Sequence, residues 1–145
     1  MNSVHSDSSS ADDNARIVAT LVPENYRLGF LPRHFGLKCM RVEQAVYGHM
    51  GRLCSRYNGS YWDFVELSNG GCYMAPRGGA YALAAPNAFE ATVSAEVAGL
   101  IASLYAFSHL AFQFETDEVF SDRFHQLREF VLEHPDAQVI LAAID

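Results

Sequence analysis

Hydrophobic and polar residues alternate most clearly over two short runs, Tyr61–Leu67 and Gly71–Ala75. Ser68-Asn69-Gly70-Gly71 joins them and is a strong hairpin signal, because Asn-Gly and Gly-Gly accept the positive φ of tight turns. Since side chains alternate between the faces of a strand, the first run divides into two sets: Tyr61, Asp63, Val65 and Leu67, and Trp62, Phe64 and Glu66. Both sets contain aromatic residues. We therefore expect the hairpin to be covered on both faces or to lie beside a binding surface.

Spacings of three and four residues predict helices over much of the remaining chain. They are expected over about Arg41–Tyr57, Ser94–Gln113, Asp117–His134 and Asp136–Ile144. Ser94 is the expected N-cap of its helix, whose small residues permit close approach by the sheet or by another helix. A shorter helix is predicted over Glu24–Phe30. It should stop at Pro32, because the residue before a proline avoids helical angles, and Arg33–Gly36 should then form a turn.

Two further strands, Tyr81–Ala84 and Phe89–Val93, are predicted after the hairpin, and Arg16–Val22 is predicted to be a short strand or an extended lead-in. The expected fold class is α+β. We expect one compact domain over residues 15–145, in which a small antiparallel β-meander of three to four strands packs with about four to five helices. Residues 1–14 contain three Asp and no Lys or Arg, and they are predicted to form a disordered tail.

Composition narrows the class of protein. The chain has 145 residues, of which 50% are hydrophobic, and this is enough for one hydrophobic core. The sequence contains no recognisable export signal or membrane span, so we expect a cytoplasmic protein with no membrane partner. Cys39, Cys54 and Cys72 are widely spaced, which favours reduced, buried thiols. A catalytic cysteine is the alternative, and it would need a histidine nearby in space.

Charge is unevenly distributed along the chain. Residues 1–77 carry a net charge of +1 and residues 78–145 a net charge of −8, while the segment Arg16–Arg56 carries +5. This pattern predicts a basic face and an acidic face, unless the charges mix in the folded protein. The overall charge of −7 disfavours tight DNA binding, because phosphate neutralisation supplies most of that affinity. Seventeen acidic residues set against ten basic ones are also too balanced for a mimic of DNA phosphates.

Two dipeptides, Arg33-His34 and Trp62-Asp63, are the candidate partner contacts. Arg33 and His34 suit phosphate or carboxylate recognition, or His34 instead caps a helix or bonds a backbone carbonyl. Asp63 lies among aromatic residues and is a candidate acid or base with a raised pKa, or it pairs with Arg77 across the hairpin. Trp62 is either a core anchor or an interaction hot spot.

The sequence contains no recognisable motif for catalysis, nucleotide binding or metal binding. His109, His125 and His134 are too far apart for a zinc-ligand pair, and the glycine pairs lie between predicted strands, where they serve turns. We therefore expect no catalytic residue, cofactor or metal site. His109 and His125 lie on apolar helices and are expected to be core or boundary histidines.

Several sequence blocks together resemble the ArdB/KlcA family of antirestriction proteins. The blocks are Thr20-Leu-Val-Pro-Glu24, Phe30-Leu-Pro-Arg-His-Phe-Gly36, Tyr61-Trp-x-Phe-x-Glu-Leu-Ser-Asn-Gly-Gly-x-Tyr-Met-Ala-Pro76, Ser94-Ala-x-x-Ala-Gly99, Glu133-His-Pro-Asp-Ala137 and Ala143-Ile-Asp145. The resemblance extends from about Ala19 to Asp145. It implies a compact α/β fold with an antiparallel sheet, and no established cofactor or catalytic residue.

The resemblance also implies a biological role. Proteins of this family protect incoming unmodified DNA from type I restriction enzymes while sparing methylation, and they are not regarded as DNA mimics. The leading hypothesis is a non-enzymatic inhibitor that contacts the restriction enzyme or an associated host protein. Two alternatives stay open: an enzyme that modifies a component of the restriction machinery, with Asp63, His34 or a cysteine in the chemistry, and a weak DNA-binding module that uses the basic segment.

Overall fold

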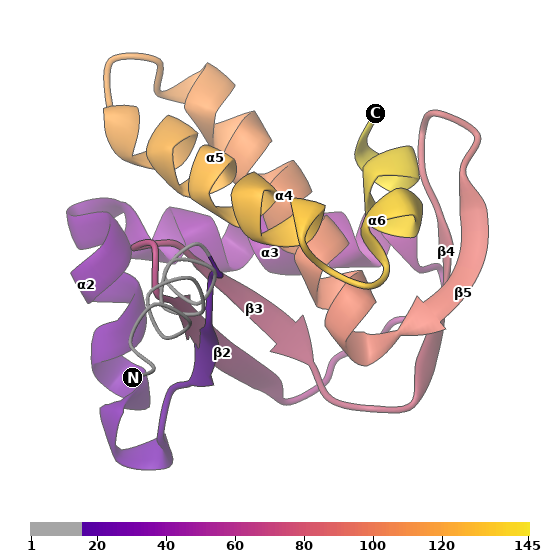
Figure 1. The fold of residues 1–145 in the computed structure, drawn as a ribbon, viewed down its shortest axis with the longest axis horizontal. Helices are drawn as coiled ribbons and strands as arrows, with labels where there is room; N and C mark the ends of the chain where they lie inside the picture. The colour runs from indigo at the N-terminus through magenta and orange to yellow at the C-terminus, as the bar shows by residue number, and fades with distance from the viewer. Residues whose placement is uncertain (1–15) are drawn as a thin grey trace, which may run out of the picture.

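The computed structural model describes residues 16–145, so the predicted tail over residues 1–14 lies outside the described residues. Helices η1 and η2 are 3-10 helices, and the other helices are α-helices (Figure 1). In chain order the elements are β1 (Ala19–Leu21), η1 (Glu24–Gly29), α2 (Phe30–Phe35), η2 (Gly36–Lys38), α3 (Cys39–Leu53), β2 (Trp62–Leu67), β3 (Cys72–Pro76), β4 (Ala80–Ala84), β5 (Glu90–Ser94), α4 (Ala95–Gln113), α5 (Glu118–Leu132) and α6 (Ala137–Ile144). The predicted α+β class is confirmed.

The predicted hairpin is the centre of the larger sheet. Strand β2 pairs antiparallel with β1 on one side and β3 on the other, with Val65 opposite both Leu21 and Tyr73. The turn closes through a hydrogen bond from the Leu67 amide to the Gly71 carbonyl, and Gly70 has a φ of +93°. Every residue of β3 is buried, as expected for a hairpin covered on both faces.

The second pair of strands forms a separate sheet and does not continue the meander. Strands β4 and β5 pair only with each other among the described residues. The outer edge of β3 is occupied by α4, where Ser103 Oγ accepts from the Met74 amide at 3.1 Å and donates to the Met74 carbonyl at 3.2 Å. A buried hydroxyl thus satisfies the two backbone groups that a fourth strand would have used.

Helix α4 lies at the centre of the fold, in contact with α3, α5, α6 and β3 (Figure 1). The predicted cap is confirmed, since Ser94 Oγ accepts from the Val97 amide at 3.2 Å. A Cβ added at Gly99 would lie 2.4 Å from the Ala75 Cα, so only glycine permits this approach to β3. The helix is long and apolar enough to span a membrane by length and composition, but 61% of its most apolar stretch is buried inside the fold.

The predicted stop at Pro32 is wrong, and so is the predicted turn at Arg33–Gly36. A new helix, α2, begins at Phe30, and Pro32 lies in its first turn. There the missing N–H costs nothing, because the first amides of a helix have no intrahelical acceptor. Helix α2 ends instead at Gly36, which has a φ of +60°.

Helix α3 is shorter than predicted. It ends at Leu53, because Cys54 adopts an extended conformation with φ −125° and ψ 105°. The Asn58-Gly59 pair, which directly follows the predicted helix, lies in the loop that leads to β2. The buried residues of α3 nevertheless recur at the predicted spacing of three and four residues: Val42, Val46, Met50 and Leu53.

Candidate functional site

A carboxylate on the sheet bonds to both side chains of Arg33-His34, one of the two dipeptides predicted to contact a partner. Glu66 Oε2 lies 2.8 Å from Arg33 Nη2 and 2.8 Å from His34 Nε2. The His34 side chain is 12% exposed, whereas that of Arg33 is 47% exposed. The cluster therefore has a buried half, which fixes α2, and an exposed half, which presents a guanidinium to solvent.

Two periodicities align these residues. Phe30 and His34 are four residues apart and lie on one face of α2, while Phe64 and Glu66 are two residues apart and lie on one face of β2. The rings of Phe30 and Phe64 stack with their centroids 4.6 Å apart and 12° between their planes. This stacking lays α2 along β2 and places His34 directly at Glu66.

Helix α5 closes the third side of the cluster. Arg123 Nη2 donates to the His34 carbonyl at 3.3 Å, and Arg123 Nη1 donates to the Gln126 side chain at 3.1 Å. Gln126 in turn donates to the Asn69 carbonyl at 3.2 Å, and Asn69 Nδ2 donates to the Gln126 carbonyl at 2.9 Å. The hairpin turn and α2 are thus held by one pair of side chains on α5.

The electrostatics of the cluster make Glu66 a poor proton acceptor. The hydrogen bond from Arg33 lowers the pKa of Glu66 below its ordinary 4.5, so this carboxylate is ionised and is a weak base. Burial lowers the pKa of His34 below 6.5, although its hydrogen bond to Glu66 opposes this effect. A neutral His34 ring therefore donates its Nε2 proton to Glu66 at neutral pH.

A second surface cluster surrounds Tyr61, whose side chain lies between two arginines. The guanidinium carbons of Arg27 and Arg77 each lie 4.4 Å from the centre of its ring, and its hydroxyl donates to Glu24 at 2.8 Å. Arg77 also forms an ion pair with Asp63 at 3.0 Å. The expected alternative role of Asp63, as the partner of Arg77 across the hairpin, is therefore the observed one.

Trp62 does not reach the surface, so its prediction as a partner contact is corrected. The residue is 3% exposed, and its indole N–H donates to the Tyr57 hydroxyl at 3.0 Å. Its ring packs on Tyr47, with the two centroids 5.2 Å apart. Trp62 is a core anchor, which was the expected alternative.

The expectation for the two histidines on apolar helices was also wrong. His109 and His125 are both exposed, because they face away from the core side of α4 and α5.

Burial raises the pKa of the Cys72 thiol to about 12, so the thiol is protonated and unreactive at neutral pH. Within residues 16–145, no group of three or more His, Cys, Asp or Glu side chains could hold a metal ion.

Sequence reasoning missed Glu66, Arg123 and Gln126 as members of the cluster. Glu66 carried a usable signal, because a charged residue on the same strand face as Trp62 and Phe64 requires a partner. The two α5 residues carried none, since Gln126 lies 57 residues from its partner in the hairpin turn.

Comparisons with known proteins show which proteins the chain is similar to. A family profile described as "Antirestriction protein" matches residues 55–145. The chain is 43% identical over 137 residues to an Escherichia coli protein named antirestriction protein KlcA, covering 89% of this chain and 94% of that protein. It is also 34% identical over 138 residues to the putative antirestriction protein YubI of Escherichia coli K12, covering 90% of this chain and 98% of that protein.

A solved structure agrees with the fold. It superposes with a TM-score of 0.84 at 44% identity and covers 89% of this chain and 95% of its own. Its description states that the KlcA and ArdB proteins show a novel fold and antirestriction activity against type I DNA restriction systems in vivo but not in vitro. By sequence and by fold, the chain belongs to the antirestriction protein family.

Proposed function

We propose that this protein protects incoming unmodified DNA in the cytoplasm by inhibiting type I restriction endonuclease activity while leaving methylation intact. The observation that carries the proposal is the 43% identity to KlcA over 89% of the chain. The related solved structure is described as showing activity in vivo but not in vitro. The same dependence here would mean that the protein acts with, or on, a cellular component that purified assays lack.

A non-catalytic mechanism is supported by how the candidate groups are used. Asp63 is paired with Arg77, and His34 is bonded to Glu66, so each polar group already serves an internal contact. An acid–base catalyst needs a pKa near the working pH and a free approach for substrate. Glu66 meets neither condition, because its pKa is lowered and its carboxylate is already paired.

A DNA-binding role for the basic segment receives little support. Three of its cations are held by carboxylates, namely Arg27 by Glu24, Arg33 by Glu66 and Lys38 by Asp117. Paired cations release few counterions from DNA, and this release drives non-specific affinity. We therefore propose a protein target, either the type I restriction enzyme or a host protein associated with it.

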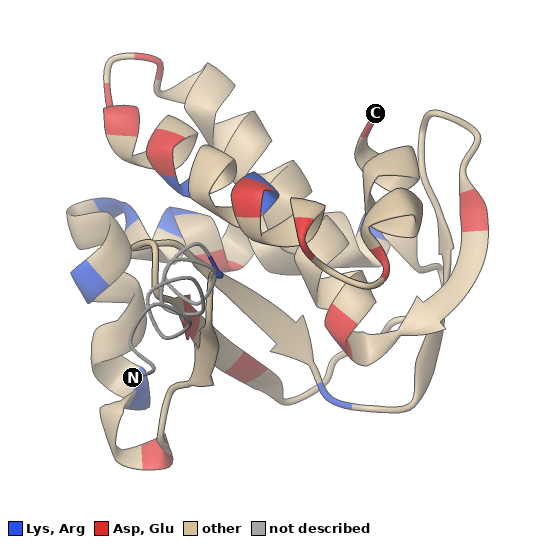
Figure 2. Ribbon diagram, viewed as in Figure 1, with Lys and Arg blue, Asp and Glu red and all other residues tan. Residues whose placement is uncertain are grey.

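The proposed contact surface is the corner between α2 and α3, which we define as Arg33, Leu37, Lys38, Met40 and Arg41. Leu37 and Met40 lie within one helical turn of each other, and they are 103% and 62% exposed. Figure 2 shows basic residues on α2 and at the start of α3, and both acidic and basic residues along α5. Exposed apolar side chains rimmed by charge are typical of protein–protein contacts.

The experiment that tests the proposal is the plating of unmodified phage on a host with a type I restriction system, with and without this gene. We expect the gene to raise plating efficiency toward that on a host without restriction. An unchanged plating efficiency, although the protein is soluble and folded, would contradict the proposed role.

A second arm tests whether methylation is spared. Phage recovered from the protected host are plated again on the restricting host without the gene. If methylation continued during the first infection, the progeny are modified and plate efficiently. Progeny that are restricted again would show that both activities are blocked, which would refute the proposed selectivity.

A further inference from the structure

The dipeptide Asn-Gly occurs twice in the chain, as Asn58-Gly59 and as Asn69-Gly70. Asparagine is a thermolabile residue. It reacts most readily before glycine, because the next backbone nitrogen attacks the carboxamide carbon and glycine places no side chain in the way. The two sites share this local chemistry, so a difference in their reactivity must come from the fold.

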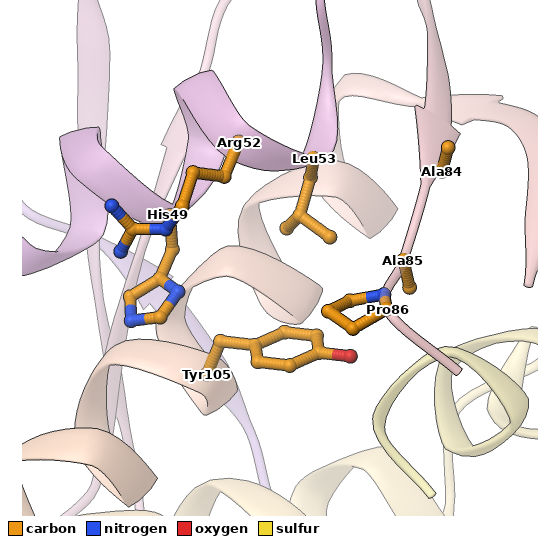
Figure 3. Close-up of a pocket in the computed structure, with 7 residues that line it drawn as sticks. All are labelled: His49, Arg52, Leu53, Ala84, Ala85, Pro86 and Tyr105. Carbon is orange, nitrogen blue, oxygen red and sulfur yellow. The ribbon is translucent and has the colours of Figure 1, made fainter. Parts of the chain in front are cut away.

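The loop that carries Asn58 is fixed at both ends. Leu53, the last residue of α3, is 4% exposed and points toward the ring of Tyr105 (Figure 3). At the other end, Ser60 Oγ donates to the Arg77 carbonyl at 2.9 Å. Asn58 lies between these two anchors, in a stretch that forms neither helix nor strand.

No contact among residues 16–145 restrains the reacting groups at Asn58-Gly59. Both residues are exposed, and neither the Asn58 carboxamide nor the Gly59 amide forms a hydrogen bond with another described residue. A Cβ added at Gly59, where φ is +116°, would meet nothing within 4 Å, so the space around this residue is open. The nitrogen that attacks and the carboxamide that it attacks are therefore both available.

The same two groups are held in place at Asn69-Gly70. Asn69 Nδ2 donates to the Gln126 carbonyl at 2.9 Å, and Asn69 Oδ1 accepts from the Gly71 amide at 3.0 Å. The attacking nitrogen is also occupied, since the Gly70 amide donates to the Leu67 carbonyl at 3.0 Å. Ring closure at Asn69 therefore requires several hydrogen bonds to break first.

We propose that Asn58 is a site of spontaneous deamidation and that the fold protects Asn69 from the same reaction. The Gly59 nitrogen bonds to Asn58 Cγ, the bond from Cγ to the carboxamide nitrogen breaks, and that nitrogen leaves as ammonia with the Gly59 amide proton. Water then opens the resulting succinimide ring at either carbonyl. The products are aspartate and isoaspartate at position 58. This proposal does not depend on the antirestriction role.

The reaction changes both the charge and the backbone of this loop. Either product adds one negative charge next to the exposed Arg56. Isoaspartate also lengthens the main chain by one carbon atom, directly after Tyr57, whose hydroxyl accepts from the Trp62 indole at 3.0 Å. Protein that ages at Asn58 is therefore more acidic, and its isoaspartyl form displaces a residue that holds Trp62.

The test is to incubate the purified full chain at physiological pH and temperature and to follow both asparagines by peptide mass spectrometry. Deamidation raises the mass of a peptide slightly, and the aspartyl and isoaspartyl products separate by chromatography. We expect both products at Asn58, formed roughly tenfold or more faster than at Asn69, because breaking the hydrogen bonds of Asn69 raises the barrier to ring closure.

An unfolded chain and a variant are the matched controls. In guanidinium chloride the hydrogen bonds of Asn69 are lost, so both sites should react at similar rates. Asn58→Gln keeps a carboxamide but must close a larger, less favoured ring, so this position should stay unmodified in the folded variant. Equal rates at the two sites of the folded protein, a difference that persists in the unfolded chain, or no conversion at Asn58 while the unfolded chain reacts would each overturn the proposal.

Discussion

At the scale of single residues, Arg123 joins segments that lie far apart in the sequence. Its Nη2 donates to the backbone of His34, 89 residues away, and its Nη1 donates to Gln126, which bonds the hairpin turn at Asn69. Its Nε is buried and has no partner among the described residues. A side chain with this many separate contacts acts as a structural link between α2, the hairpin and α5.

Histidine burial gives a prediction for the pH dependence of stability. The pKa of His49 falls from 6.5 to about 4 on folding, and burial also lowers that of His34. Below pH 6.5 the unfolded chain therefore binds more protons than the folded one, so stability present above pH 6.5 is lost as the pH falls toward 4. Urea unfolding across this range should show a decreasing free energy of unfolding.

The variant His49→Gln should flatten this slope, because glutamine does not titrate. His125→Gln, at an exposed position on α5, is the control and should keep the wild-type slope. Equal slopes in all three proteins would contradict the assignment to His49. The lowered pKa of Glu66 acts below its ordinary 4.5 and so lies outside most of this window.

At the scale of elements, local signals predicted where most elements lie, and long-range packing decided the rest. The Ser94 cap and the Asn-Gly turn act within a few residues, so helix α4 and the hairpin were predictable. The division of the strands into two sheets depends on Ser103, which occupies the β3 edge from 29 residues away. Pro32 misled because a proline that ends one helix is equally compatible with the first turn of the next.

Two glycines on neighbouring helices should respond in opposite ways to the same substitution. A methyl group at Gly99 would lie 2.4 Å from the Ala75 Cα, so Gly99→Ala should destabilise the fold by about 1–3 kcal/mol or more through overpacking. Gly51 on α3 has nothing within 4 Å of the same position. Gly51→Ala should therefore stabilise the protein by about 0.5–1 kcal/mol through helix propensity.

Thermal and urea unfolding of both variants measure the difference. The two substitutions add the same atoms, so a general effect of alanine would move both proteins in one direction. Opposite signs would show that the close approach of α4 to β3 determines the result. A Gly99→Ala variant as stable as wild type would mean that α4 can shift away from β3 at little cost.

At the scale of the whole molecule, the uneven charge along the sequence becomes only a partial separation in space. Basic residues gather on α2 and the start of α3, whereas α5 carries acidic residues interspersed with basic ones (Figure 2). The Lys38–Asp117 ion pair, at 2.8 Å, lies where the two regions meet. The sequence predicted two faces of opposite charge. It could not show that several of the cations are already paired, because their partners come from distant elements.

This geometry makes the α2–α3 corner testable with a matched control. Leu37 is 103% exposed, and its replacement by serine removes apolar contact area without disturbing the core. Leu132 is 54% exposed at the far end of α5, roughly 22 Å from the Asp117 cap at 1.5 Å per residue. Leu37→Ser and Leu132→Ser are therefore the same chemical change at two separated places on the surface.

If the corner contacts the restriction machinery, Leu37→Ser should lower the recovery of unmodified phage by roughly tenfold or more, as expected when a central apolar contact of an interface is lost. Leu132→Ser should protect as well as wild type. Both proteins should keep their soluble level and melting temperature, because exposed substitutions usually change stability by less than about 0.5 kcal/mol. Full protection by Leu37→Ser, or loss of protection in Leu132→Ser alone, would place the contact elsewhere, with the exposed surface of α5 as the next one to test.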